Sequence, residues 1–170
     1  MMKDLQKAKQ LFWDYACSHF HLDREGMRSR YIELGGADEH EAKWRQEYIE
    51  YWSERLSVDD LTAVNQLWHA HAHEALPRLM ALTAAGDGYA KLWFSLAIAD
   101  LCREAGVPRA VRKEAREMAS AVWSDLVANP QSISPTHKKA IRPSMHALDA
   151  RTPEEYVHNY AERKLNEMRH

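Results

Sequence analysis

Apolar residues recur along the chain with a helical period, and residues 61–82 form one broadly apolar stretch. Apolar or small side chains occur on nearly every side of this stretch, which is typical of a central, buried helix. Pro77 lies inside it. Because proline in a helix interior removes a backbone hydrogen bond, we expect a kink or break near residues 73–77. Residues 89–105 form a second broadly apolar helix, which Gly106 ends.

Further helices surround these two. The spacing of apolar residues predicts them over residues 3–22, over residues 25–34, from residue 38, over residues 108–128 and from residue 152 onward. Asp38, followed by Glu41 three positions later, makes a start that resembles a capping box. Residues 130–151 contain three prolines and several basic side chains, and we expect an irregular excursion there before the last helix.

The fold class follows from this pattern. Strand-like alternation and internal repeats of fixed period are absent from the sequence. A chain of 170 residues is long enough to bury one core. The sequence therefore predicts an all-α protein with a single helical domain over residues 1–170. We expect a bundle of about five to six helices with two broadly apolar helices at its centre.

Composition restricts the classes of function. The formal net charge is −2, so nucleic-acid binding would require a local basic patch. The first ten residues lack the apolar run of a signal peptide, and the longest apolar-rich run, residues 92–99, is too short to span a bilayer. These features predict a cytoplasmic protein without membrane contact. In that compartment we expect Cys17 and Cys102 to be reduced.

Three histidines occur within five residues of the central stretch, namely His69, His71 and His73. Residues four apart lie one turn apart on the same side of a helix, so His69 and His73 could bind one divalent transition-metal ion. The other ligands would have to come from elsewhere in the fold. Glu155 and His158 also match half of the carboxylate–histidine motif of di-iron bundles. The alternative is that these histidines pack in the core or border a groove.

Residues 98–107, with the sequence IADLCREAGV, show a local resemblance. The segment is similar to the first helix and turn of the helix-turn-helix of lac-repressor-type regulators. That pattern has an apolar residue where this chain has Arg112, and here the apolar residue is Val111. The resemblance implies a DNA contact through a set of basic side chains that could meet phosphates, namely Arg109, Arg112, Lys113 and Arg116. Because two glutamates interleave with them, an ordinary helical hairpin is the alternative.

Motifs for nucleophilic catalysis or phosphate binding are absent, and the sequence predicts no catalytic residue. Six tryptophans and seven tyrosines would suit an interface. We therefore expect a small binding protein of the adaptor, inhibitor or immunity type that contacts another protein. Two alternatives stay open. One is a metal-binding bundle or metal-dependent enzyme centred on His69 and His73, and the other is a DNA-binding protein that uses residues 98–116. Self-association would use the same kinds of surface.

Overall fold

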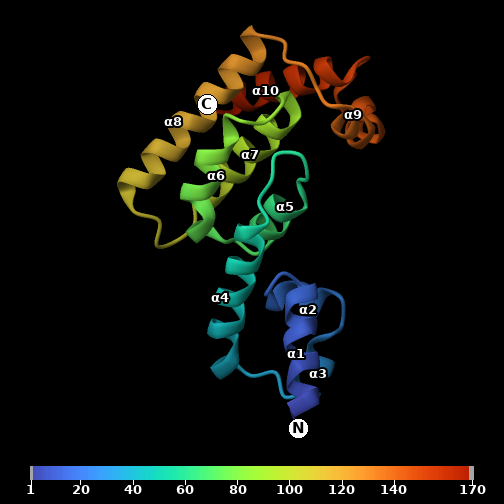
Figure 1. Cartoon of the computed structure of the whole chain (residues 1–170), viewed down its shortest axis with the longest axis vertical. Helices are drawn as coiled ribbons and strands as arrows, with labels where there is room; N and C mark the ends of the chain where they lie inside the picture. Colours follow the sequence, from blue (N-terminus) through green and yellow to red (C-terminus); the bar gives the residue numbers. More distant parts are fainter. Residues whose placement is uncertain (1, 169–170) are drawn as a thin grey trace.

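The computed structural model describes residues 2–168, and all regular secondary structure within them is helical (Figure 1). The predicted all-α class is therefore confirmed for this part of the chain. It contains ten α-helices and two 3-10 helices, so the expected number of five to six helices is not confirmed. Five of the α-helices have 13 or more residues, and the other five have eight or fewer.

The N-terminal part folds around a small aromatic cluster at one end of the molecule (Figure 1). Its helices are α1 (Met2–Asp14), α2 (His19–Arg24), α3 (Arg28–Glu33) and α4 (Asp38–Glu54). The ring of Phe12 lies 5.7 Å from that of Tyr31 and 6.3 Å from that of Trp44, measured between centroids. Aromatic rings provide large buried area, so this cluster attaches α1 and α3 to the first half of α4.

The central stretch contains two helices, α5 (Thr62–His69) and α6 (Leu76–Thr83), with the 3-10 helix η1 (His73–Ala75) before α6. The chain turns at residues 70–72, where His71 has a left-handed φ of 51°. The central stretch is therefore not one continuous helix, and the break expected near residues 73–77 is present, although the α-helix is already interrupted from residue 70. Pro77 lies in the first turn of α6, where the missing N–H removes no hydrogen bond.

Helix α7 (Gly88–Leu101) is central, with ten of its 14 residues buried. Helices α8 (Arg109–Ala128) and α10 (Pro153–Met168) pack along it, as does α6 (Figure 1). Within the core, the indole N–H of Trp123 on α8 donates to Oγ of Ser95 at 2.7 Å. The second broadly apolar helix predicted from the sequence is thus confirmed, although it ends earlier than expected.

The segment between α8 and α10 is more ordered than expected. It contains α9 (Pro135–Ile141) and the 3-10 helix η2 (Arg142–Leu148). His137 is buried, and its Nδ1 lies 2.8 Å from Oδ2 of Asp87, the N-cap residue of α7. The backbone N–H of Ser134 donates to the same carboxylate oxygen at 2.8 Å. These contacts attach the segment to the start of the central helix.

Two further findings bear on the expected environment. Within residues 2–168, no helix has both the length and the apolar character needed to cross a membrane. Cys17 and Cys102 are free thiols, in agreement with the expectation that they are reduced. Burial raises the pKa of the Cys17 thiol to about 12, so this thiol stays protonated at neutral pH.

Candidate functional site

The histidines that the sequence singled out have different neighbours. His69 is the last residue of α5 and His73 is the first residue of η1, with the left-handed turn between them. The helical spacing on which the pair was predicted is therefore absent. The His69 ring lies 6.3 Å from that of His21, whereas Nδ1 of His73 lies 3.8 Å from Oε2 of Glu74. Metal binding by His69 and His73 stays a prediction that these contacts do not test.

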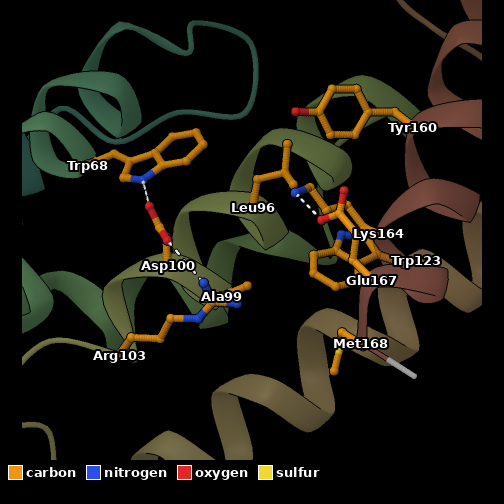
Figure 2. Close-up of a pocket in the computed structure, with 10 residues that line it drawn as sticks. All are labelled: Trp68, Leu96, Ala99, Asp100, Arg103, Trp123, Tyr160, Lys164, Glu167 and Met168. Atoms are coloured by element: carbon orange, nitrogen blue, oxygen red, sulfur yellow. Dashed lines mark hydrogen bonds and ion pairs between the residues drawn. The ribbon is translucent and has the colours of Figure 1, made fainter. Parts of the chain in front are cut away.

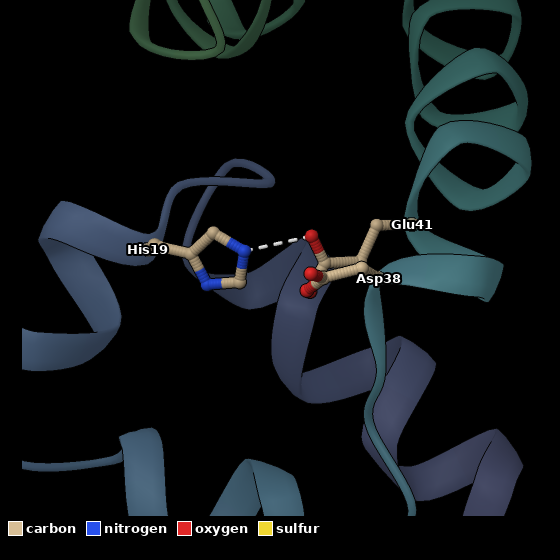
Figure 3. Close-up of side chains that lie close together, drawn as sticks. All are labelled: His19, Asp38 and Glu41. Atoms are coloured by element: carbon tan, nitrogen blue, oxygen red, sulfur yellow. Dashed lines mark hydrogen bonds and ion pairs between the residues drawn. The ribbon is translucent and has the colours of Figure 1, made fainter.

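A different group of side chains has the spacing of metal ligands. Within the described residues, potential ligand atoms of His19, Asp38 and Glu41 all lie within 4.8 Å of one another. Figure 3 shows the imidazole of His19 facing the two carboxylates across the gap between α2 and α4. Nε2 of His19 lies 2.7 Å from Oε2 of Glu41. His19 and Glu41 are half-buried, and Asp38 is exposed.

The two carboxylates face His19 because of where α4 begins. The N-cap residue is Ala37, which has extended backbone angles and no side-chain cap. Asp38 and Glu41 are therefore the first and fourth helical residues, and the expected capping box is wrong. Residues three apart lie on the same side of a helix, so both carboxylates point toward the start of α2. Asp38 has no hydrogen bond or ion pair with any other described residue.

Tyr31 of α3 orients Glu41. Its hydroxyl donates to Oε1 of Glu41 at 2.7 Å, so Oε2 is the oxygen that faces His19. Burial raises the pKa of Tyr31, and the hydrogen bond to the Glu41 carboxylate raises it further. Tyr31 therefore stays a hydrogen-bond donor at neutral pH. Sequence reasoning missed the group of His19, Asp38 and Glu41, because its members lie on two helices and only the spacing of Asp38 and Glu41 was visible.

A small cavity lies where α5, α7, α8 and α10 meet (Figure 2). Its volume is about 230 Å³, below the roughly 300–1,000 Å³ of typical small-molecule pockets. Trp68 forms one wall and donates its indole N–H to Oδ2 of Asp100 at 2.9 Å. Lys164 and Glu167 form the opposite wall and are 2.7 Å apart. The cavity thus combines aromatic surface with charges that are already paired.

Three further depressions neighbour this cavity. One of them shares Trp68 and Asp100 with it and is also lined by His21, His69 and Trp93. A second shares Arg103 with the cavity, and a third, along the first half of α8, shares Arg116 with the second. We call the surface that carries these four neighbouring depressions the groove. Its lining residues come from α2, α5, α7, α8 and α10 and from the segments beside them.

The groove is more basic than the chain as a whole. Its lining carries six cationic side chains and three carboxylates, a net charge of +3 with neutral histidines, against −2 for the whole chain. Each carboxylate lies within 4 Å of a cation of the groove, the pairs being Asp100 with Arg103, Glu117 with Lys113 and Glu167 with Lys164. Among the described residues, Arg109, Arg112 and Arg116 have no carboxylate partner, so the α8 end of the groove is the positive end.

The helix-turn-helix interpretation concerns this same end. Residues 98–107 lie at the end of α7 and in the turn before α8, and Gly106 has the left-handed φ of 91° that a turn requires. Arg112 donates to the carbonyl oxygens of Glu104, at 3.2 Å, and Val107, at 3.5 Å. It therefore holds the turn, whereas Arg109, Lys113 and Arg116 are exposed. DNA contact by these residues stays a prediction.

The partial di-iron motif has a structural role. Oγ1 of Thr152 accepts the backbone N–H of Glu155 at 3.1 Å, and Oε2 of Glu155 accepts the N–H of Arg151 at 2.7 Å. The pattern resembles a capping box in which the N–H of Arg151 takes the place of the N–H of Thr152, the residue before α10. Glu155 thus caps α10 and is engaged by the backbone.

The chain matches no family of proteins, no curated protein and no solved structure. The features of the molecule that bear on its function are therefore the groove and the group of His19, Asp38 and Glu41.

Proposed function

We propose that this protein is a binding protein whose groove takes an acidic, partly apolar segment of a partner protein. The observation that carries the proposal is the groove itself, with its uncompensated arginines at one end and aromatic side chains at the other. A series of neighbouring depressions over several helices suits an extended or helical segment better than a compact small molecule.

Charge supports an acidic partner. The cations that have carboxylate neighbours add little net field, because their partners neutralise them. The positive potential of the groove therefore comes mainly from Arg109, Arg112 and Arg116, which lie on the first turns of α8. A complementary acidic segment would gain affinity and a faster association rate from this potential. The chain as a whole is acidic, so the attraction is local to this surface.

Aromatic side chains support a partner with apolar anchors. Trp68 and Trp93 are half-buried, and their rings form an edge-to-face pair at 5.9 Å. Trp68 is held by Asp100, and Trp93 by the side-chain oxygen of Asn65. Rings that are already oriented lose little conformational freedom on binding, which is the property of residues that dominate interface energies.

A nucleic acid fits the groove less well. Asp100, Glu117 and Glu167 line the same depressions and would face a phosphate backbone. Because phosphate contacts dominate affinity for nucleic acids, this interleaving of charges favours a protein partner.

The test compares two charge-reversal variants of equal charge. Arg109→Glu/Arg116→Glu reverses the positive end of the groove, and Arg78→Glu/Lys139→Glu reverses two exposed cations outside it. The tagged wild-type protein and both variants are used for affinity purification from the source cells. Quantitative mass spectrometry identifies proteins that the groove variant loses and the control retains. The purified partner is then titrated by calorimetry at several salt concentrations.

We expect the groove variant to weaken binding by at least about tenfold, and the control to change it by less than about twofold. The bound segment of the partner should be acidic, and its affinity should fall with salt. Equal binding by both variants, or failure of the wild-type protein to bind any partner, would contradict the proposal. Salt-sensitive binding of duplex DNA by the wild type alone would instead support the nucleic-acid interpretation.

A further inference from the structure

We propose that His19, Asp38 and Glu41 form a binding site for a divalent transition-metal ion, independent of the groove. The three ligand atoms lie within 4.8 Å of one another and come from the start of α2 and the first turn of α4 (Figure 3). An ion with bonds of about 2.0–2.2 Å would need only small rotations of these side chains to contact all three. Asp38 is exposed and unpaired, so it can make the largest adjustment.

The donor set defines the class of ion. One imidazole nitrogen and two carboxylate oxygens suit zinc and other first-row divalent ions, and they do not suit soft ions that require thiolates. Mg²⁺ and Ca²⁺ prefer oxygen ligands alone, so the histidine selects against them. Three protein ligands leave at least one position for water, which is the arrangement of an open zinc site.

The surroundings of the site hold two of the three ligands in place. The Tyr31 hydroxyl fixes Oε1 of Glu41 and leaves Oε2 for the ion. The ring of His19 lies 5.8 Å from Phe12 and 6.2 Å from Tyr31, so the aromatic cluster of the N-terminal part orients it. Outer contacts of this kind support metal ligands in proteins because they reduce the freedom that binding must remove.

The second ring nitrogen of His19 lacks a hydrogen-bond partner among the described residues, and this lack limits the expected affinity for the ion. Nδ1 of His19 is closed to solvent and has no hydrogen-bond partner among the described residues. A histidine that binds metal through Nε2 usually donates its other N–H to an acceptor, and loss of such a partner weakens binding by about 10- to 100-fold. We therefore expect a Kd in the micromolar range, weaker than that of a structural zinc site.

The experiment titrates zinc into the 170-residue chain after removal of metal with a chelator. Calorimetry gives stoichiometry and Kd, and the absorption spectrum of added Co²⁺ reports the geometry of the ligands. Asp38→Asn removes an exposed ligand, so the variant should fold. Glu39→Gln is the matched control, because it removes the neighbouring exposed charge that lies outside the ligand group. His69→Ala/His73→Ala removes the histidines of the pair predicted from the sequence.

We expect one zinc ion per chain, a Kd at least about tenfold higher in Asp38→Asn, and an unchanged Kd in both controls. Thermal unfolding of the metal-free variants verifies that each is folded. The proposal is overturned if the wild type takes up no zinc at about 100 µM free ion. It is equally overturned if Asp38→Asn binds zinc as the wild type does, or if the His69→Ala/His73→Ala variant loses the ion.

Discussion

Gly36 lies against the ring of Tyr31, and a side chain at this position would occupy space that the ring already fills. A Cβ atom on Gly36 would lie 2.3–2.5 Å from three ring atoms. Tyr31 is only 1% exposed and therefore has no room to move away. We expect Gly36→Ala to lower the free energy of unfolding by about 3 kcal/mol, the upper range for overpacking, as measured by urea denaturation.

The steric explanation has a direct control. Gly26 has a left-handed φ of 69° and no neighbouring atom within 4 Å of an added Cβ. Gly26→Ala should therefore cost only the backbone strain, about 1 kcal/mol. In a double-mutant cycle, Tyr31→Ala should relieve most of the Gly36→Ala effect and none of the Gly26→Ala effect. An equal Gly36→Ala effect in both backgrounds would exclude the ring as its cause.

At the scale of helices, Asp87 connects the start of α7 to the segment before α9. Its carboxylate accepts hydrogen bonds from the N–H of Ala90 at 2.9 Å and from the N–H of Ser134 at 2.8 Å. Its Oδ2 also lies 2.8 Å from Nδ1 of His137. Burial acts to raise the pKa of Asp87, but these hydrogen bonds outweigh it, and the pKa of the carboxyl is lowered. A carboxyl with a lowered folded-state pKa stabilises the fold above its unfolded pKa of about 3.9. That contribution is lost as the pH falls through the folded-state value.

We expect Asp87→Asn to lower the free energy of unfolding by about 2 kcal/mol at neutral pH. Asparagine still caps helices well, so the loss reports the contacts with Ser134 and His137. The difference between wild type and variant should shrink as the pH approaches about 3. Urea denaturation at neutral pH and at about pH 3 measures this difference in the free energy of unfolding. A difference of the same size at both pH values would contradict this assignment.

Asp60→Asn is the control, since Asp60 is exposed and accepts only from nearby Thr62. This substitution should lower the free energy of unfolding by less than about 1 kcal/mol.

The break between α5 and α6 shows which part of the helix pattern could be predicted. The periodicity of apolar residues correctly indicated helix on both sides, because that signal is local. The break itself is held by Arg45, which lies on α4 and donates to the carbonyl oxygens of Ala70, at 2.6 Å, and His71, at 3.2 Å. A contact between residues 25 apart in the chain is invisible to local pattern reasoning. Pro77 was a signal for a break, but proline is also favoured where a helix begins.

At the scale of the whole molecule, the difference between local patterns and contacts far apart in the chain also explains which sites the sequence could predict. The all-α class and the buried α7 followed from composition and spacing, which are summed over many residues. The groove and the His19, Asp38 and Glu41 group depend on how separate helices meet. His19 and Glu41 are 22 residues apart, and the one motif around Glu41, the capping-box-like spacing with Asp38, pointed to a helix start and not to a metal ligand. The histidines with a visible motif, His69 and His73, lie on either side of a turn that the motif could not reveal.

Local unfolding should be easier in some helices of the molecule than in others. Ten residues of α7 are buried, whereas α2 and α3 each bury one, Leu22 and Tyr31. Local opening is least costly where few apolar contacts are lost. We therefore expect amides of α2 and α3 to exchange with deuterium first and those of α7 last, as followed by mass spectrometry.

Zinc provides a second comparison in the same experiment. An ion held by His19, Asp38 and Glu41 would connect α2 to α4, because its ligands lie on both helices. It should slow exchange in α2 and in the first turns of α4, and leave α7 unchanged. Asp38→Asn should abolish this difference. Equal protection of α2 and α7 without metal would show that the N-terminal part opens only with the whole molecule. The stability of the groove would then depend on the aromatic cluster as much as on α7.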